Sequence, residues 1–251
     1  VMLTYQELLA RGLHAVGLNF RSCSGEPNRL ARFYHSGETG DLDHVLGVLH
    51  DRFPGVPIGV IGYSLGGNVL LRYLGERGEA AGARVHAAVG VSVPFDLTAG
   101  GEALERGIMG KVYTEYFLRS LRRKVMAKEA LLAGRCDVEA VRRARTLREF
   151  DDAITAPLPG FEDAADYYRR ASSAAVLEAI RVPTLLLQSE DDPFLPARHL
   201  PRDAVRRNPA LVAAFTRRGG HVGFVGGALP WRPRFWAEAE AARFLQFRLL
   251  G

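Results

Sequence analysis

The sequence predicts an α/β fold in which a mostly parallel sheet carries helices on both faces. Short apolar runs alternate along the chain with longer amphipathic segments, which is typical of repeated strand–helix units. The 251 residues, 47% of them hydrophobic and 24% charged, suffice for one large domain with a substantial core. The alternation stops between residues 94 and 166. We therefore expect a single domain, with its core in 1–93 and 167–251 and a helical insertion at 94–166.

The expected elements follow from hydrophobic periodicity and from the positions of glycine and proline. The segment 41–52 repeats leucine and valine on one helical face, whereas 85–93 is an Ala- and Val-rich run of the kind found in buried parallel strands. A long polar loop is expected over 21–40. In chain order, helices are predicted at 3–11, 41–52, 68–74, 203–207 and 233–249, and strands at 15–20, 57–61, 85–93, 183–188 and 211–216.

The insertion 94–166 is expected to be helical, rich in arginine, and aromatic at Tyr113, Tyr116 and Phe117. An insertion of this length between two strands favours a cap over a substrate cleft. A helical decoration without a role in substrate binding is the alternative.

Composition narrows the classes of function. The net charge of +5 and the pI of about 9.5 fit solvated basic helix faces, with attraction of anionic lipid or acyl substrates as the alternative. No compact basic block with interleaved aromatic residues appears, which argues against nucleic-acid binding. No apolar run reaches the roughly 18 residues of a membrane helix, and the cytoplasm is the default location.

Cofactor and metal motifs are also missing from the sequence. No G-x-G-x-x-G follows a predicted strand and no P-loop is present. Cys23 and Cys136 are far apart and in no C-x-x-C pair, so we expect packing roles for them rather than a disulfide framework or a zinc site. No pair of histidines has metal-ligand spacing with a carboxylate. We expect neither a cofactor nor a metal.

The pentapeptide Gly62-Tyr63-Ser64-Leu65-Gly66 is the most informative motif. It lies between an apolar run and a helical segment, and this is the context of a nucleophile elbow. Glycines permit a strained turn that exposes the serine hydroxyl, and the helix that follows directs its free N–H groups and positive dipole end towards charge developing beside it. Ser64 is therefore the expected nucleophile.

A serine hydroxyl needs an adjacent base that a third group orients. Histidine suits the role because its ordinary pKa is near 6.5. Of the seven histidines, His221 lies just past the last predicted strand with glycines on both sides, and it is the expected base. A structural loop histidine is the alternative.

The acid is expected in the loop after the strand 183–188. Asp192 is preferred for its spacing to Pro196, and Asp191 is the alternative. Either aspartate can also cap its own turn. The order Ser, Asp, His along the chain differs from that of chymotrypsin and subtilisin and agrees with that of α/β-hydrolases.

Taken together, the motifs resemble the YheT-like branch of the α/β-hydrolase superfamily, which includes bacterial predicted hydrolases and eukaryotic esterases or lipid hydrolases. The matching stretches span nearly the whole chain: 19–28, 34–41, 62–66, 92–97, 146–151, 191–194 and 219–224. The resemblance implies an α/β-hydrolase fold with Ser64 as nucleophile, Asp192 as acid, His221 as base and the Leu65 N–H as one oxyanion donor.

The chain departs from this family at its start. The family has further strands upstream and a His-Gly-rich loop that supplies a second oxyanion N–H, whereas this chain begins with Val1-Met2-Leu3. We expect a truncated form of a longer enzyme that lacks the strand between 15–20 and 58–61. Direct pairing of those two segments is the alternative.

The expected function is hydrolysis of carboxylic (acyl) esters through a Ser-His-Asp triad and an acyl-enzyme intermediate. The substrate would be a small acyl ester or a lipid, and a lipid substrate would be compatible with peripheral contact to a membrane. Two alternatives are an alcohol acyltransferase that uses the same triad and a non-catalytic binding protein on a hydrolase scaffold. The complete triad argues against the second, and the absent oxyanion loop argues for it.

Overall fold

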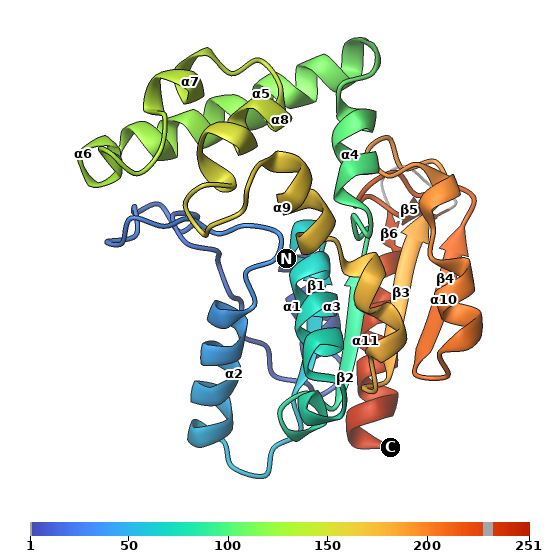
Figure 1. Ribbon diagram of the computed structural model, residues 1–251. Helices are drawn as coiled ribbons and strands as arrows, with labels where there is room; N and C mark the ends of the chain where they lie inside the picture. The colour runs from blue at the N-terminus through green and yellow to red at the C-terminus, as the bar shows by residue number, and fades with distance from the viewer. Residues whose placement is uncertain (1, 228–232) are drawn as a thin grey trace. The chain divides into compact units, whose positions relative to one another are not determined.

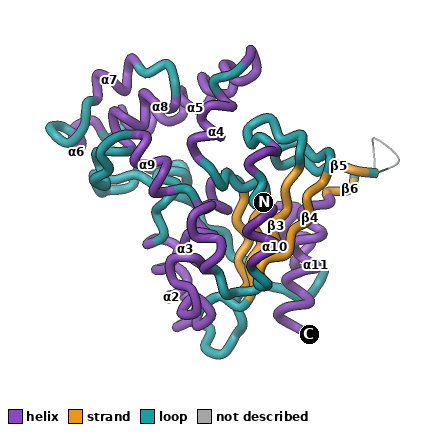
Figure 2. Tube along the Cα trace, turned by 45° about the vertical axis from the view of Figure 1, so that its right-hand side comes forward, coloured by secondary structure: helices purple, strands orange, loops and turns teal. Residues whose placement is uncertain are grey.

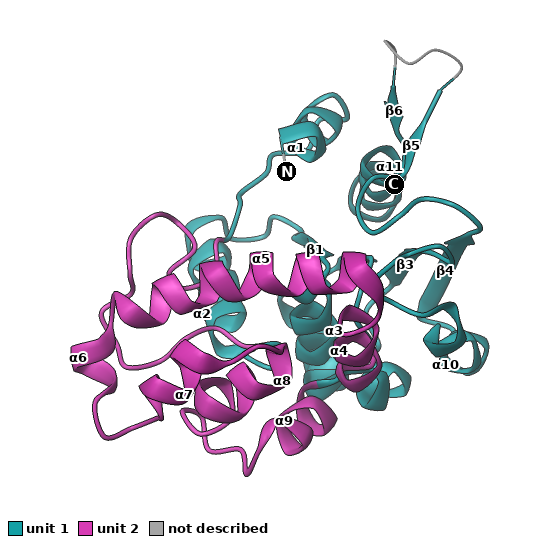
Figure 3. Cartoon of the chain, turned by 90° about the horizontal axis from the view of Figure 1, so that it is seen from above, with its two compact units in different colours: residues 1–18, 36–95, 172–251 teal, residues 19–35, 96–171 magenta. Residues whose placement is uncertain are grey.

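The computed structural model describes residues 2–227 and 233–251, which form two compact units. Val1 and residues 228–232 lie outside the described residues. The first unit comprises residues 1–18, 36–95 and 172–251, and the second comprises 19–35 and 96–171 (Figure 3). The second unit contains nearly all of the insertion expected at 94–166, and that this insertion covers a substrate site stays a prediction.

The first unit is built on a parallel sheet with the strand order β1-β2-β3-β4. The strands are β1 (Gly59–Tyr63), β2 (Ala87–Val91), β3 (Thr184–Ser189) and β4 (Leu211–Thr216). Every residue of β2 and β3 is buried, as expected for central strands of a sheet covered on both faces. Because the strands are parallel, their carboxyl ends meet at one edge of the sheet, where ligands bind in such folds.

Helices cover both faces of this sheet, as predicted. Alternate residues of β2 and β3, such as Val89 and Leu187, pack in one cluster with α11 (Trp236–Leu250) and with Leu8 of α1 (Met2–Leu9). On the opposite face, a Cβ added to Gly90 of β2 would lie 3.7 Å from Leu71 Cδ1 of α3 (Leu65–Arg77). Figure 2 shows the strands between α3 and α11.

The other elements of the first unit are short apart from α2. They are α2 (Gly40–Arg52), α10 (Arg202–Arg207), the 3-10 helices η1 (Gly78–Ala83), η3 (Ser173–Ala179) and η4 (Ala197–His199), and the antiparallel pair β5 (Val225–Gly226) and β6 (Arg234–Phe235) (Figure 1). The pair β5–β6 was not predicted, because two residues are too few for a periodic signal.

The strand predicted at 15–20 is wrong. These residues form no strand, and Val16 and Leu18 are 67% and 46% exposed. A strand exists only where its backbone N–H and C=O groups pair with a neighbour. Within the described residues β1 pairs with β2 alone, so 15–20 does not pair directly with β1 either.

The second unit is helical, as the insertion was predicted to be. Its helices are α4 (Leu97–Leu104), α5 (Gly107–Met126), α6 (Glu129–Leu132), α7 (Val138–Arg143), α8 (Leu147–Phe150) and α9 (Ala164–Ala171), with a turn of π-helix, η2 (Asp151–Thr155), after α8. Thr146 and Glu149 form a capping box that begins α8. Leu118, Val125 and Ile154 belong to the unit's own apolar core.

A buried lysine fastens the polar segment 19–35 to the rest of the second unit. Lys128 is 3% exposed, and its Nζ donates to Asn28 Oδ1 and to the Arg32 carbonyl, each at 2.8 Å. The ammonium also lies over the Phe33 ring, 4.0 Å from its centroid. Burial, with the nearby Arg21, lowers the pKa of Lys128.

The cysteines differ from each other. Cys136 is half-buried against the core of the second unit, as expected for a packing residue. Cys23 is exposed, which contradicts the same expectation, and its Sγ accepts a hydrogen bond from Lys124 Nζ at 2.9 Å.

In the part of the chain that the structure describes, no helix is both long and apolar enough to span a membrane.

Candidate active site

Ser64 occupies a strained turn between β1 and α3. Its backbone has φ 49° and ψ −122°, a region that a residue with a Cβ rarely adopts. The Ser64 N–H donates to the Val91 carbonyl of β2 at 2.8 Å, and the Ser64 carbonyl accepts from the N–H groups of Gly67 and Asn68. These bonds join the turn to the sheet on one side and to the first turn of α3 on the other, as the predicted elbow requires.

Two glycines allow this turn to close. A Cβ on Gly62 would lie 2.6 Å from the Gly66 carbonyl oxygen and 2.7 Å from Gly67 Cα. A Cβ on Gly67 would lie 3.0 Å from the Gly62 carbonyl oxygen and 2.5 Å from Val93 Cγ2. Gly62 belongs to the predicted motif, but the role of Gly67, one residue beyond it, was missed. The double glycine at the start of a helix was the available signal, since glycine is unfavourable there without a packing reason.

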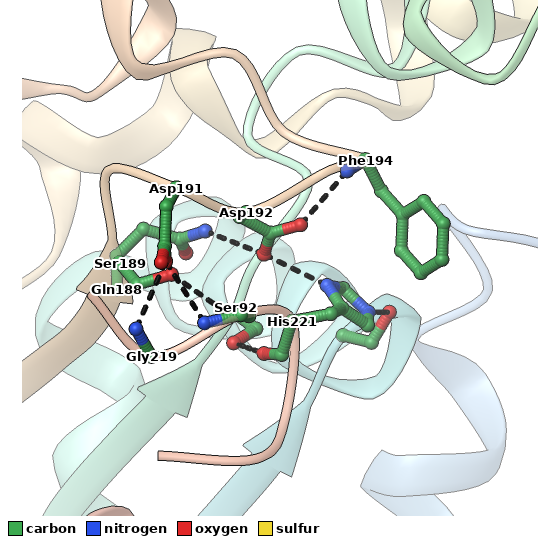
Figure 4. A network of polar contacts seen from close by, with 10 residues as sticks. Ser92, Gln188, Ser189, Asp191, Asp192, Phe194, Gly219 and His221 are labelled. Carbon is green, nitrogen blue, oxygen red and sulfur yellow. Dashed lines mark hydrogen bonds and ion pairs between the residues drawn. The ribbon is translucent and has the colours of Figure 1, made fainter. Parts of the chain in front are cut away.

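The structure brings together the three residues predicted as a triad. Figure 4 shows the carboxylate of Asp192 directed towards the His221 ring. His221 Nε2 lies 2.8 Å from Ser64 Oγ, and His221 Nδ1 lies 2.8 Å from Asp192 Oδ2. Asp192 has no exposed side-chain surface and the His221 side chain is 17% exposed. With Asp192 ionised and accepting, Nδ1 carries the imidazole proton and Nε2 is free to accept the Ser64 hydroxyl proton.

Asp192 accepts hydrogen bonds from other groups besides the imidazole. Its Oδ2 also accepts from Gln188 Nε2 at 3.2 Å, and its Oδ1 accepts from the Phe194 N–H at 2.9 Å. Asp192 therefore closes an Asx turn with one oxygen and meets His221 with the other. The Phe194 ring packs edge-on to the imidazole, with centroids 4.7 Å apart. Sequence reasoning did not single out Gln188 or Phe194, although both flank the acidic pair closely.

Asp191, the alternative acid, faces away from the imidazole. Its Oδ1 accepts from the backbone N–H groups of Gly219 and Gly220, both at 2.9 Å. The Gly220 N–H is the main cause that lowers the pKa of Asp191, with further contributions from Ser189 and from the Gly219 N–H. Asp192 thus contacts the side chain of His221, whereas Asp191 contacts the backbone of the loop that carries His221.

Leu65, the predicted oxyanion donor, is the first residue of α3 and follows Ser64 directly. The first N–H groups of a helix have no intrahelical acceptor, and they lie at the positive end of the helix dipole. Three residues later, in the same first turn, Asn68 is fully buried and fixes the helix start, because its Nδ2 donates to the Ser36 carbonyl and its Oδ1 accepts from the Ser173 N–H.

Two of the other histidines have contacts of their own. His86 Nδ1 accepts from the Ile58 N–H at the start of the sheet, and His35, in the second unit, packs against the rings of Phe161 and Tyr167. Among the described residues, no three side chains of His, Cys, Asp or Glu gather as metal ligands would. The expectations for metal and cofactor stay predictions.

Comparison with known proteins places this site in a family. The α/β-hydrolase fold model matches residues 5–225. YheT of Escherichia coli is 40% identical over 237 residues, which are 94% of this chain and 68% of that protein. Phospholipase ABHD3 of Homo sapiens is 32% identical over 94% of this chain and 57% of its own length, and monoacylglycerol lipase of Saccharomyces cerevisiae is 31% identical over 91% and 51%.

The chain thus spans about two thirds of YheT and little more than half of these eukaryotic relatives. Among solved structures, the Pyrococcus furiosus esterase Pf2001 aligns with 99% of this chain and 75% of its own, at a TM-score of 0.60 and 19% identity, a likeness of fold. The chain therefore belongs to the α/β-hydrolase family and is a YheT-like member of it.

Proposed function

We propose that this protein hydrolyses carboxylic esters through Ser64, His221 and Asp192. The observation that carries the proposal is the unbroken series of contacts from the Ser64 hydroxyl through both imidazole nitrogens to a buried carboxylate, with two contacts of 2.8 Å. A nucleophile within reach of a base, which a third group orients, is the arrangement that activates serine.

In the acylation step, Ser64 Oγ attacks the ester carbonyl carbon while His221 Nε2 takes the hydroxyl proton. Asp192 stabilises the imidazolium that forms and stays ionised itself. The carbonyl oxygen becomes an oxyanion, to which the Leu65 N–H donates at the start of α3. His221 then returns the proton to the departing alcohol oxygen, and an acyl-Ser64 ester remains.

In the deacylation step, a water molecule loses a proton to His221 Nε2 and attacks the acyl carbon. The second tetrahedral intermediate collapses when the same proton returns to Ser64 Oγ, which releases the acid and restores the enzyme. An alcohol in place of water would give acyl transfer by the same steps.

The proposed substrates are acyl esters, lipids included. Support comes from relatives that are named phospholipase and monoacylglycerol lipase. Because those relatives extend well beyond the region matched here, the substrate of the whole protein is part of the proposal.

The test is covalent labelling with a fluorophosphonate probe, with the adduct located by mass spectrometry, alongside hydrolysis of p-nitrophenyl esters of increasing acyl length. We expect an adduct on Ser64 that His221→Ala abolishes. His50→Ala, a change at an exposed histidine on α2, serves as the matched control and should label normally. Hydrolysis without formation of an ethyl ester when ethanol is present would favour esterase over acyltransferase activity. Absence of any adduct on Ser64 would favour the non-catalytic alternative.

A further inference from the structure

The loop that carries His221 needs outside contacts to hold the imidazole in place. Gly219, Gly220 and Gly223 surround the histidine, and Gly220 has φ +62°. Glycine adopts many backbone conformations, so such a loop does not define one position by itself. The imidazole nevertheless has to meet Ser64 and Asp192 at the same time.

Three side chains from the carboxyl edge of the sheet contact the backbone of this loop (Figure 4). Ser92 Oγ, just past β2, donates to the His221 carbonyl. Ser189 Oγ, at the end of β3, donates to the Gly220 carbonyl at 2.6 Å. Asp191 Oδ1 accepts from the N–H groups of both Gly219 and Gly220. Backbone groups of three consecutive loop residues are thus bonded to groups anchored on two central strands.

Ser92 is the least ordinary of the three. It is fully buried, and its φ of +52° lies in the left-handed region where glycine is the usual residue. Its N–H donates to the Leu187 carbonyl of β3 at 2.9 Å, so its backbone is continuous with the sheet. Serine differs from glycine at this position by its hydroxyl group. This hydroxyl donates to the backbone carbonyl of His221, the predicted base.

Gly219 brings the loop close to these anchors. A Cβ on Gly219 would lie 3.0 Å from Ser189 Cβ and 2.6 Å from a Phe224 ring atom, so a larger residue would lift the loop. The Phe224 N–H closes the turn by donating to the Gly219 carbonyl at 2.8 Å.

We propose that Ser92, Ser189 and Asp191 are positioning residues that hold the backbone of Gly219, Gly220 and His221 so that the imidazole spans Ser64 and Asp192. The proposal rests on the proposed function, in which His221 is the base. A displacement of about 1 Å in a catalytic group costs on the order of 100-fold in rate. Loss of one of these three side-chain contacts should therefore lower kcat and leave substrate affinity unchanged.

The experiment compares Ser92→Ala, Ser189→Ala, Asp191→Ala and Asp191→Asn with the parent protein. We expect kcat for ester hydrolysis and the rate of Ser64 labelling to fall about 10- to 100-fold in the three alanine variants, with KM within about threefold. Asp191→Asn keeps an acceptor oxygen for the Gly219 and Gly220 N–H groups, so it should recover most of the loss.

Ser173→Ala is the matched control. Ser173 is a fully buried serine on η3 whose Oγ has no hydrogen-bond partner in the described part of the chain, and its backbone N–H, which donates to Asn68 Oδ1, is kept in the alanine variant. This variant removes a buried hydroxyl of the same size, and kcat should stay within about twofold of the parent.

A second readout does not depend on turnover. The Nδ1 proton shared between His221 and Asp192 should give a far-downfield line in the one-dimensional proton NMR spectrum, identified by its loss in His221→Ala. We expect this line to broaden or vanish in Ser92→Ala and to persist in Ser173→Ala. Because Asp191 is exposed, its two variants carry the test if Ser92→Ala does not fold.

The outcomes separate the two proposals. If the parent neither hydrolyses esters nor labels, but its downfield line is lost on Ser92→Ala, the proposed function fails and the positioning role stands. If the parent is active and the anchor variants keep both its kcat and its downfield line, the positioning role is wrong. An equal loss of kcat in Ser173→Ala would also overturn it, because a general effect on the core would then explain the data.

Discussion

Gly62 and Gly67 approach each other so closely that a Cβ on Gly62 would lie 2.7 Å from the Cα of Gly67. The obstructing atoms belong to backbone, which cannot swing aside as a side chain can. The end of β1 and the start of α3 are therefore in contact through main chain, and Ser64 lies between them at φ 49°. The geometry of the serine turn therefore requires glycine at positions 62 and 67, where any other residue would add a Cβ.

We expect Gly62→Ala and Gly67→Ala each to lower the free energy of unfolding by about 1–3 kcal/mol, as overpacking does, and to lower kcat/KM by more than tenfold because Ser64 is displaced. Chemical denaturation and ester hydrolysis measure the two effects. Gly82→Ala is the control, since a Cβ there has no atom within 4 Å. Equal stability of Gly62→Ala and Gly82→Ala would contradict this interpretation.

Asp192→Asn should lower kcat by about 10³- to 10⁴-fold with little change in fold, because an amide in place of the carboxylate favours the wrong imidazole tautomer and does not stabilise the imidazolium. Asp191→Asn should lower kcat by no more than about tenfold, since it keeps the oxygen that accepts from the loop. Steady-state kinetics on the pair assigns the acid. The reverse order of losses would make Asp191 the acid.

The raised pKa of Asp151, in the second unit, should make the stability of the protein depend on pH. Burial raises the pKa of Asp151 to about 6, although Thr155 and Tyr168 lower it through hydrogen bonds, the latter as a donor to Oδ2 at 2.7 Å. An aspartate in the unfolded chain has a pKa of about 3.9, so the folded state binds the proton more tightly. The stabilisation from this proton is complete below about pH 4 and is lost as pH rises through 6.

Asp151→Asn removes this titration while it keeps an oxygen for the Tyr168 hydroxyl. We expect the free energy of unfolding of the variant, relative to the parent, to be highest above pH 7 and to fall between pH 7 and pH 4. Denaturation curves across that range measure it. A difference independent of pH would show that Asp151 titrates in the folded protein as it does in the unfolded chain.

Lys128→Met should loosen the segment 19–35. The substitution keeps most of the side-chain volume but leaves Asn28 Oδ1 and the Arg32 carbonyl without the ammonium that donates to them. The expected loss in the free energy of unfolding is about 1–3 kcal/mol, the range for hydrogen bonds from a charged donor. Asn28 Oδ1 keeps its bond from Ser22 Oγ and the Arg32 carbonyl keeps its bond from Asn28 Nδ2, so neither acceptor is left without a donor. Limited proteolysis followed by mass spectrometry should show faster cleavage within 19–35, and Lys111→Met, at an exposed lysine of α5, should leave the rate unchanged.

The local hydrophobic pattern predicted the position of a strand well where that strand has a hydrogen-bonding neighbour in the sheet. The runs 183–188 and 211–216 became β3 and β4 almost residue for residue. Short apolar runs of this kind are typical of strands, and β3 is buried along its whole length whereas β4, at the edge of the sheet, is only partly buried. The run 15–20 has the same appearance but forms no strand, since strand formation depends on a partner that the run itself does not encode.

The sequence by itself determined the family, the α/β fold and the identity of Ser64 and His221 as candidates, because each has a local signature of glycines and flanking apolar runs. Only the tertiary structure decided which of two adjacent carboxylates meets the imidazole, and that Ser92 contacts a histidine 129 positions away. Neighbouring side chains in a turn point in different directions, and the bonds that orient them join the ends of separate strands. Periodicity reports which face of an element is buried, and it carries no information about which distant loop the sheet edge will meet.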